Sequence, residues 1–281
     1  MKTTLNKTNI ILISIILLSL ISSTFFGMKL AILLCLLLLL FLIYLIITKH
    51  YFIKVYKGMK AYKIENYSNA LENYRDAALS KYCSGPIISN YLICELKYGK
   101  PSIAREYIDE NLISKNIKSN EKLNLEVTKA IVLWKTNSQE EAINLLKHLI
   151  ENNKNTYIYE TLTSLLLASG KFNEAKKYIS EAMEFNSDNN IIKSNYAELC
   201  FKFEQFDEAE KTFDYLINEN VKFIEPYYYS ALLERKKGNC DKAFELLRIA
   251  ESFNESLVSL ITHKDIEQAL NSVLIKSLNM N

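Results

Sequence analysis

The chain of 281 residues contains only 6 Gly and 3 Pro, and 23% of its residues are charged. So little Gly and Pro favours long helices with short connections, and the charged fraction excludes a wholly disordered polypeptide. The net charge of +2 is unevenly distributed, because residues 1–64 contain eight Lys and no Asp or Glu, which leaves −6 on residues 65–281. That acidic part argues against a protein that binds nucleic-acid phosphates, so no nucleic-acid partner is expected.

Two uncharged apolar stretches follow a short tail of residues 1–8. Together they predict a two-helix transmembrane hairpin over 9–48, with spans at about 9–27 and 29–48. The second stretch, Leu30–Thr48, has 19 residues. At about 1.5 Å per residue it reaches roughly 28 Å, which is close to the thickness of the bilayer core. A cleaved signal peptide is the alternative for the first stretch, but the run is long for one and contains no clear A-x-A site.

The distribution of lysines around the hairpin predicts its orientation. Lys2 and Lys7 precede the first span and Lys29 lies in the turn, whereas five lysines follow the second span within residues 49–63. The positive-inside rule therefore places both termini in the cytoplasm of a multi-pass protein of the cell membrane.

Residues 49–63 form a basic juxtamembrane stretch that is expected to merge into the first repeat helix, since no Pro or Gly interrupts the chain from Lys29 to Lys57. Tyr and Phe stand among its lysines, and this mixture suits the interface of an anionic membrane. Two interpretations stay open, a plain stop-transfer flank and specific lipid recognition. The candidate membrane-interface residues are Lys49, Lys54, Lys57 and Lys60.

An internal period runs through the rest of the chain. It is carried by six alanines spaced by 33 to 38 residues, namely Ala70, Ala104, Ala142, Ala175, Ala209 and Ala243. A large apolar or aromatic residue stands four positions after each alanine, so the two share one helix face. Mostly small residues stand twelve positions before them, namely Gly58, Leu92, Ala130, Thr163, Ala197 and Ala231. Small residues on both helices allow the two helices of a pair to pack closely.

A turn is expected between the two helices of each pair. Five positions before the alanines stand Glu65, Gly99, Asn137, Gly170, Glu204 and Gly238. Gly or Asn just past a helix end supplies a left-handed cap for the last carbonyl groups of that helix. The pattern therefore predicts a series of helix–turn–helix units.

These units resemble the tetratricopeptide repeat, a helix–turn–helix of 34 residues, in its bacterial membrane-anchored form. The stretches that match best are residues 159–189 and 227–256, followed by 194–217 and 56–79. The unit around Ala104 departs from the pattern, since Asn111 stands at a position that is usually small and apolar. The gap of 38 residues that follows Ala104 predicts an additional loop near Ser114–Lys122.

The resemblance covers about residues 52–256 and implies an all-α fold. One repeat cannot bury its apolar face alone, so about six stacked units are expected to share a continuous core as an α-solenoid over residues 52–261. A helix near Lys264–Leu278 carries apolar residues on one side, and residues 262–281 are predicted to form a capping helix and tail. The whole chain is then a transmembrane hairpin followed by a soluble solenoid.

No residue pattern indicates catalysis, a cofactor or a metal site. The three His stand at 50, 148 and 263 without metal-ligand spacing, and no phosphate-binding loop, G-x-S-x-G or G-x-G-x-x-G motif occurs. The five cysteines form no C-x-x-C pair, which favours free thiols in a reducing compartment. They are Cys35, Cys83, Cys94, Cys200 and Cys240. We therefore expect a protein that is not an enzyme and has no cofactor.

The resemblance implies that partners bind the concave face, which the first helix of each unit builds. The repeat register places ten candidates for a partner-binding groove there, namely Met59, Tyr62, Ile93, Leu96, Ile131, Trp134, Leu167, Phe201, Tyr228 and Leu232. The same register places Glu160, Ser164, Ser194 and Glu198 on this face. An apolar groove suits an amphipathic helix or an apolar peptide, and coverage by neighbouring parts of the chain or by a second copy is the alternative.

Lysines and tyrosines on the first helices have two interpretations each. A Lys ends five of these helices, which suggests a basic stripe for an acidic ligand or, more simply, a complement to the helix dipole. These lysines are Lys63, Lys97, Lys135, Lys202 and Lys236. In the triplet Tyr227–Tyr229, Tyr227 is expected in the core, and one of the other two either lines the groove or packs as an ordinary helix residue.

These features together predict a membrane-anchored, non-enzymatic scaffold or adaptor. It would bind a protein or peptide partner on the cytoplasmic face through its repeats, and the lipid bilayer through residues 9–48. A self-assembling structural membrane protein, present as a homo-oligomer, is the first alternative. A membrane-bound enzyme is the weaker one, because the motifs of catalysis are missing.

Overall fold

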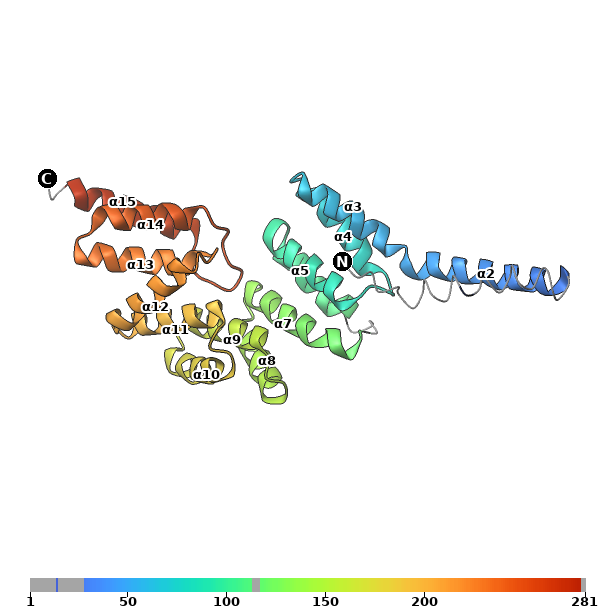
Figure 1. The fold of residues 1–281 in the computed structure, drawn as a ribbon, viewed down its shortest axis with the longest axis horizontal. Helices are drawn as coiled ribbons and strands as arrows, with labels where there is room; N and C mark the ends of the chain where they lie inside the picture. Colours follow the sequence, from blue (N-terminus) through green and yellow to red (C-terminus); the bar gives the residue numbers. More distant parts are fainter. Residues whose placement is uncertain (1–13, 15–27, 113–116, 279–281) are drawn as a thin grey trace. The chain divides into compact units, whose positions relative to one another are not determined.

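A computed structural model of the chain describes residue 14, residues 28–112 and residues 117–278 (Figure 1). Within these ranges the regular elements are fourteen α-helices and one short π-helix, and no strand occurs among them. The predicted all-α class is therefore confirmed. The chain divides into two compact units, Met1–Cys83 and Ser84–Asn281.

The first unit contains a long apolar helix followed by a helical hairpin. Its helices are α2 (Met28–Lys49), α3 (Tyr51–Lys63) and α4 (Tyr67–Leu79). Helix α2 corresponds to the second predicted span, whereas the first predicted span, residues 9–27, lies outside the described residues. His50, alone between α2 and α3, keeps helical dihedral angles of φ −58° and ψ −29°. The chain therefore passes almost without interruption from the apolar helix into the first repeat helix.

Helices α3 and α4 cross closely because Gly58 leaves room at their contact. A Cβ atom at position 58 would lie 2.6 Å from the ring of Tyr74 on α4. Ala61 and Ala70, one on each helix, are buried. Close approach of the helices is the physical reason for the small residues at these repeat positions.

The second unit is a succession of helical hairpins followed by a final helix. Its elements are α5 (Gly85–Tyr98), α6 (Pro101–Tyr107), η1 (Ile108–Leu112), α7 (Ser119–Lys135), α8 (Gln139–Asn152), α9 (Thr156–Ala168), α10 (Phe172–Phe185), α11 (Asn190–Lys202), α12 (Phe206–Asn218), α13 (Ile224–Lys237), α14 (Cys240–Glu251) and α15 (His263–Leu278). Consecutive helices pack as pairs from α7/α8 to α13/α14. The first helices α7, α9, α11 and α13 also contact one another in that order (Figure 1).

The six alanines of the sequence period lie at helix contacts, as predicted. Each of them is at most 2% exposed. Within the second unit, the residues twelve positions earlier are buried as well, namely Leu92, Ala130, Thr163, Ala197 and Ala231. Two apolar clusters form the core of this unit, one over α7–α11 and one over α11–α15. We call them the middle cluster and the C-terminal cluster.

Five of the six turn residues have the left-handed conformation. Their φ angles are 58° at Glu65, 63° at Asn137, 70° at Gly170, 58° at Glu204 and 91° at Gly238. Gly99 differs, with φ −118° and ψ −134°. A Cβ atom on Gly99 would meet the carboxylate of Glu95, which accepts a hydrogen bond from the Lys100 N–H at 3.0 Å. Position 99 thus requires Gly for space and not for a positive φ.

The unit around Ala104, irregular in sequence, is irregular in structure too. Helix α6 has only 7 residues and continues into the π-helix η1, which contains Asn111. The predicted loop near Ser114–Lys122 ends earlier than expected, because α7 begins at Ser119. Glu121 in its first turn accepts a hydrogen bond from the Gly85 N–H at 2.8 Å, which ties the start of α7 to the start of α5.

The C-terminal end of the unit has an irregular excursion between two helices. Residues 252–262 leave α14, lie beside the first helices of earlier repeats and return to α15. We call them the crossing segment. The carboxylate of Glu255 accepts a hydrogen bond from the His263 N–H at 2.6 Å, which holds the two ends of the excursion together. Helix α15 then packs on α13 and α14, with Ile266 and Val273 buried.

Candidate functional site

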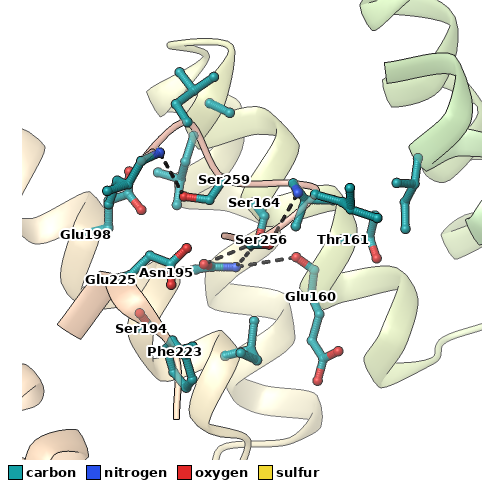
Figure 2. Close-up of a pocket in the computed structure, with 18 of the residues that line it drawn as sticks. Glu160, Thr161, Ser164, Ser194, Asn195, Glu198, Phe223, Glu225, Ser256 and Ser259 are labelled. Atoms are coloured by element: carbon teal, nitrogen blue, oxygen red, sulfur yellow. Dashed lines mark hydrogen bonds between the residues drawn. The ribbon is translucent and has the colours of Figure 1, made fainter. Parts of the chain in front are cut away.

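The inner side of the second unit holds a cavity of about 360 Å³ (Figure 2). Its walls come from the first helices α5, α7, α9, α11 and α13, and the crossing segment lies against it. Five successive repeats therefore contribute to one site. A volume of this size is typical of pockets that hold a small ligand or several side chains of a peptide.

Part of the cavity wall is aliphatic. Ile93 on α5, Ile131 on α7 and Leu167 on α9 line it. Ile131 and Leu167 are each 4% exposed, whereas Ile93 is half-buried. Ile93 and Ile131 stand eleven positions before the repeat alanines, as do Ser164 and Glu198, which also line the cavity. The stacking of equivalent positions in successive repeats thus brings these side chains together.

Asn195 joins α11 to α9 at the polar side of the cavity. Its amide donates a hydrogen bond to Thr163 Oγ1 at 2.8 Å. It also donates to Ser164 Oγ at 3.0 Å and to the Glu160 carbonyl oxygen at 3.4 Å (Figure 2). The Ser164 hydroxyl in turn donates a hydrogen bond to Asn195 Oδ1 at 3.4 Å. Asn195 and Thr163 are buried, so this network fixes the spacing of two neighbouring first helices.

Two carboxyl groups lie next to this network. The Glu160 carboxylate accepts a hydrogen bond from the Asn189 amide at 2.6 Å, and the Glu198 carboxylate accepts one from the Tyr229 hydroxyl at 2.7 Å. Burial raises the pKa of both carboxyl groups, and these hydrogen bonds oppose the rise. Burial, followed by the proximity of Glu198, holds the pKa of Tyr229 well above its usual value. Additional negative charge would therefore be unfavourable in this cavity.

Ser194 lines the cavity, but its hydroxyl oxygen is enclosed by the protein and has no hydrogen-bond partner among the described residues. Its side chain is 2% exposed. A buried hydroxyl that forms no hydrogen bond costs about 1–3 kcal/mol.

The crossing segment contacts the cavity through its residues 256–261. Val258 packs against the middle cluster, and Ile261 belongs to the C-terminal cluster. The N–H groups of Val258 and Ile261 donate hydrogen bonds to the hydroxyl groups of Ser256 at 3.3 Å and Ser259 at 3.1 Å (Figure 2). The segment thus satisfies these backbone groups internally and meets the helices through apolar side chains.

The predicted groove residues divide into several groups. Ile93, Ile131 and Leu167 line the cavity, and Leu96 lines a neighbouring depression beside residues 254–257. Trp134 belongs to the middle cluster, and three others pack against the C-terminal cluster, namely Phe201, Tyr228 and Leu232. Met59 and Tyr62 belong to the first unit, where both are exposed. Binding of a partner by these residues stays a prediction.

Some residues of the site were not anticipated from the sequence. Asn195 and residues 256–261 line the cavity, and the repeat register gave no signal for either. Tyr229 lines it as well, whereas Tyr227 is buried in the core. The register placed Tyr228 in the groove, whereas Tyr228 packs against the C-terminal cluster and does not line the cavity.

Residues 166–234, which include parts of α9 and α13 and all of α11, match the tetratricopeptide repeat family. This part of the chain consists of tetratricopeptide repeats. The matched residues carry Leu167, Asn195 and Tyr229, so the family match and the cavity coincide over the middle of the second unit. No curated protein matches the sequence.

Two solved structures share the fold of this chain. A tetratricopeptide repeat protein from Parabacteroides merdae is 14% identical, with a TM-score of 0.50 over 80% of this chain and 98% of the other. The pilF protein of Pseudomonas aeruginosa is 16% identical, with a TM-score of 0.52 over 78% of this chain and 96% of the other. At such low identity the likeness establishes the fold alone.

The repeat protein has no group of three or more His, Cys, Asp and Glu placed to hold a metal ion, as far as its described residues extend. Its described cysteines are all free thiols. Burial raises the pKa of Cys94 and Cys200, which makes these thiols less nucleophilic than an ordinary cysteine.

Proposed function

We propose that this tetratricopeptide-repeat protein is a membrane-anchored, non-enzymatic scaffold that binds a protein or peptide partner in the cytoplasm through the inner face of its repeats. The cavity walled by five first helices is the observation that carries this proposal. Stacked repeats create extended concave surfaces for binding. A largely apolar pocket with a few fixed polar groups is the common form of a recognition site.

Helix α2 supports the membrane anchor. It has 22 residues, which at about 1.5 Å per residue gives roughly 33 Å. Its part Ile32–Lys49 is the one helical stretch in the described residues that is long and apolar enough to cross a bilayer. Leu40 and Ile46 are 62% and 68% exposed, and such surfaces are stable in lipid but not in water. We include residues 9–27 in this proposal as the first span of the hairpin.

The lysines after α2 support a cytoplasmic position for the repeats. Lys57 and Lys60 are exposed and accessible to anionic headgroups. The Lys49 ammonium lies 5.7 Å from the centre of the Phe52 ring, and Lys54 forms an ion pair with Asp76 at 2.6 Å. An exposed ion pair of this kind is weak, so Lys54 retains the freedom to exchange its partner for a headgroup.

Crosslinking in native membranes, followed by capture of the full-length chain and mass spectrometry, tests the proposal. We expect the variant Ile93→Glu to capture at least tenfold less partner than the wild-type chain, because the substitution places a carboxylate in the aliphatic wall of the cavity. Ile249→Glu on α14 is the matched control, since Ile249 is 42% exposed and lies outside the cavity. It should retain the partner.

Capture of the same partner by both variants would contradict a role for the cavity. Recovery of only the chain itself would favour a self-assembling homo-oligomer in place of a scaffold. Loss of the partner in both variants would place the binding surface elsewhere on the repeats.

A further inference from the structure

The cavity of this protein is not open to solvent along its whole length, because the crossing segment already lies against it. Residues 256–261 read Ser-Leu-Val-Ser-Leu-Ile, carry no charge and have no regular secondary structure. They come from the far end of the unit, after α14, and yet line the same cavity as Ile93 on α5. A short uncharged stretch of chain thus occupies the place where a solenoid receives a peptide.

We propose that the crossing segment is an internal ligand of this cavity, and that the partner inserts an extended, uncharged peptide of aliphatic and hydroxyl residues that displaces it. This proposal rests on the proposed function, since it specifies the chemistry of the partner for the same cavity.

The attachment of the segment is suited to displacement. Its described hydrogen bonds lie within the segment or at its ends, where Glu255 binds His263 and Thr262 binds Asp265. None of the described hydrogen bonds joins residues 256–261 to α5, α7, α9, α11 or α13. Withdrawal of the segment would therefore break the apolar contacts of Val258 with the middle cluster and of Ile261 with the C-terminal cluster, but no hydrogen bond to the repeats.

The segment does not fill the cavity. About 360 Å³ remains between it and the helices. A peptide with longer aliphatic side chains would fill more of this volume. A partner peptide would therefore form apolar contacts that the internal segment does not form.

The charges around the cavity explain why the peptide should be uncharged. Carboxyl groups of Glu160, Glu198 and Glu225 line it, and an acidic peptide would meet all three. The ammonium groups of Lys97 and Lys202 line it too, and would oppose a basic peptide. Groups of both signs, two of them already hydrogen-bonded, favour a ligand without charge.

A peptide titration tests this proposal directly. A fluorescein-labelled peptide of residues 256–262, blocked at both ends, is titrated with the full-length chain in mild detergent and followed by fluorescence anisotropy, with empty micelles as the blank. Val258→Asp places a charge against the middle cluster and expels the segment. Asn254→Asp is the matched control, because Asn254 belongs to the same segment, is exposed and does not line the cavity.

We expect the Val258→Asp variant to bind the peptide at least tenfold more tightly than the wild-type chain, because the tethered segment no longer competes for the cavity. The Asn254→Asp variant should bind it like the wild type. Val258→Ser, a milder change, should show the same direction of effect and serves if the first variant does not fold. Equal affinity in all variants, or no binding by either Val258 variant, would overturn the proposal.

The outcome separates this inference from the proposed function. If Ile93→Glu loses a captured partner but neither Val258 variant binds the peptide, the scaffold function stands and the internal-ligand proposal fails. If a Val258 variant binds the peptide tightly and no partner is captured from membranes, the internal-ligand proposal stands and the scaffold function fails. A concentration-dependent dimer that Val258→Asp dissociates would assign the segment to the cavity of a second copy and would also overturn the proposal.

Discussion

Single turn residues show how local conformation shapes the repeats. Glu65 and Glu204 have φ angles of 58°, in the left-handed region that Gly and Asn usually occupy. Gly170 and Gly238 occupy the same region without the strain that a Cβ atom introduces. The stacked fold therefore imposes a left-handed turn even where the side chain disfavours it, and the sequence alone would not have predicted this at a Glu.

Glu204→Gly is expected to raise the free energy of unfolding by about 0.5–1 kcal/mol, because it relieves left-handed strain at an exposed turn. Gly170→Ala should lower it by about 1 kcal/mol, since an added Cβ meets nothing within 4 Å and the change reports conformation alone. Urea unfolding of the full-length chain, followed by the fluorescence of Trp134, measures both. Equal stability of the two variants would contradict this account of the turns.

The Glu198 carboxyl group makes stability depend on pH. Burial holds its pKa above the ordinary value of 4.5, so the folded chain binds a proton that the unfolded chain releases. The resulting stabilisation is complete below pH 4.5 and is lost as the pH rises through the folded pKa. Glu198→Gln keeps an acceptor for the Tyr229 hydroxyl and removes the ionisation.

We therefore expect Glu198→Gln to raise the melting temperature at pH 7 and to change it little at pH 4. Glu184→Gln, at an exposed position of α10, is the control and should have little effect at either pH. Thermal melts of both variants and of the wild-type chain at pH 4 and pH 7 measure these melting temperatures. A stabilising effect of Glu198→Gln that is the same at pH 4 and pH 7 would show that the ionised carboxylate is not the cause.

At the scale of elements, the sequence predicted the helix pairs because their period reports local packing. Ala142 and Ala175 repeat at a spacing set by one helix–turn–helix, and burial of both follows from that spacing alone. The π-helix at Ile108–Leu112 and the early start of α7 depend on contacts between distant residues, such as that of Glu121 with Gly85. A periodic pattern contains no information about such contacts.

The cavity was predictable in part for the same reason. The register identified the inner face of the first helices, and Ile93 and Ile131 do line the cavity there. It did not separate residues that line the cavity from large ones that pack in the core, such as Trp134 on the same helix as Ile131. Nor did it reveal the crossing segment, because residues 252–262 have no period and reach the cavity only through the tertiary fold.

The Asn195 network predicts how strongly two neighbouring first helices depend on one polar side chain. Asn195→Ala should lower the free energy of unfolding by about 1–3 kcal/mol, because buried groups of Thr163 and Ser164 lose their donor. Asn218→Ala, at the exposed end of α12, is the control and should change it by less than about 0.5 kcal/mol. Urea unfolding measures both. A loss no larger than that of the control would contradict a structural role for the network.

At the scale of the whole molecule, the membrane anchor predicts protection of α2. Cys35 in this helix is exposed in the structure, so only lipid would shield its thiol. In a chain whose other four cysteines are replaced by Ala, we expect Cys35 to resist a membrane-impermeant maleimide in native membranes and to react after detergent is added. A Cys placed at the exposed position Lys57 should react from the cytoplasmic side alone. Equal labelling of Cys35 before and after detergent would contradict a membrane-spanning α2.

The central claim is that a partner binds the inner face of the repeats. The most direct measurement replaces Ser164, in the cavity wall, with a photo-crosslinking amino acid in the full-length chain, and compares it with the same replacement at Lys176, on the exposed side of α10. Irradiation of native membranes should give a discrete crosslinked protein from position 164 and none from position 176. Crosslinks to the same protein from both positions, or from position 176 alone, would contradict the claim.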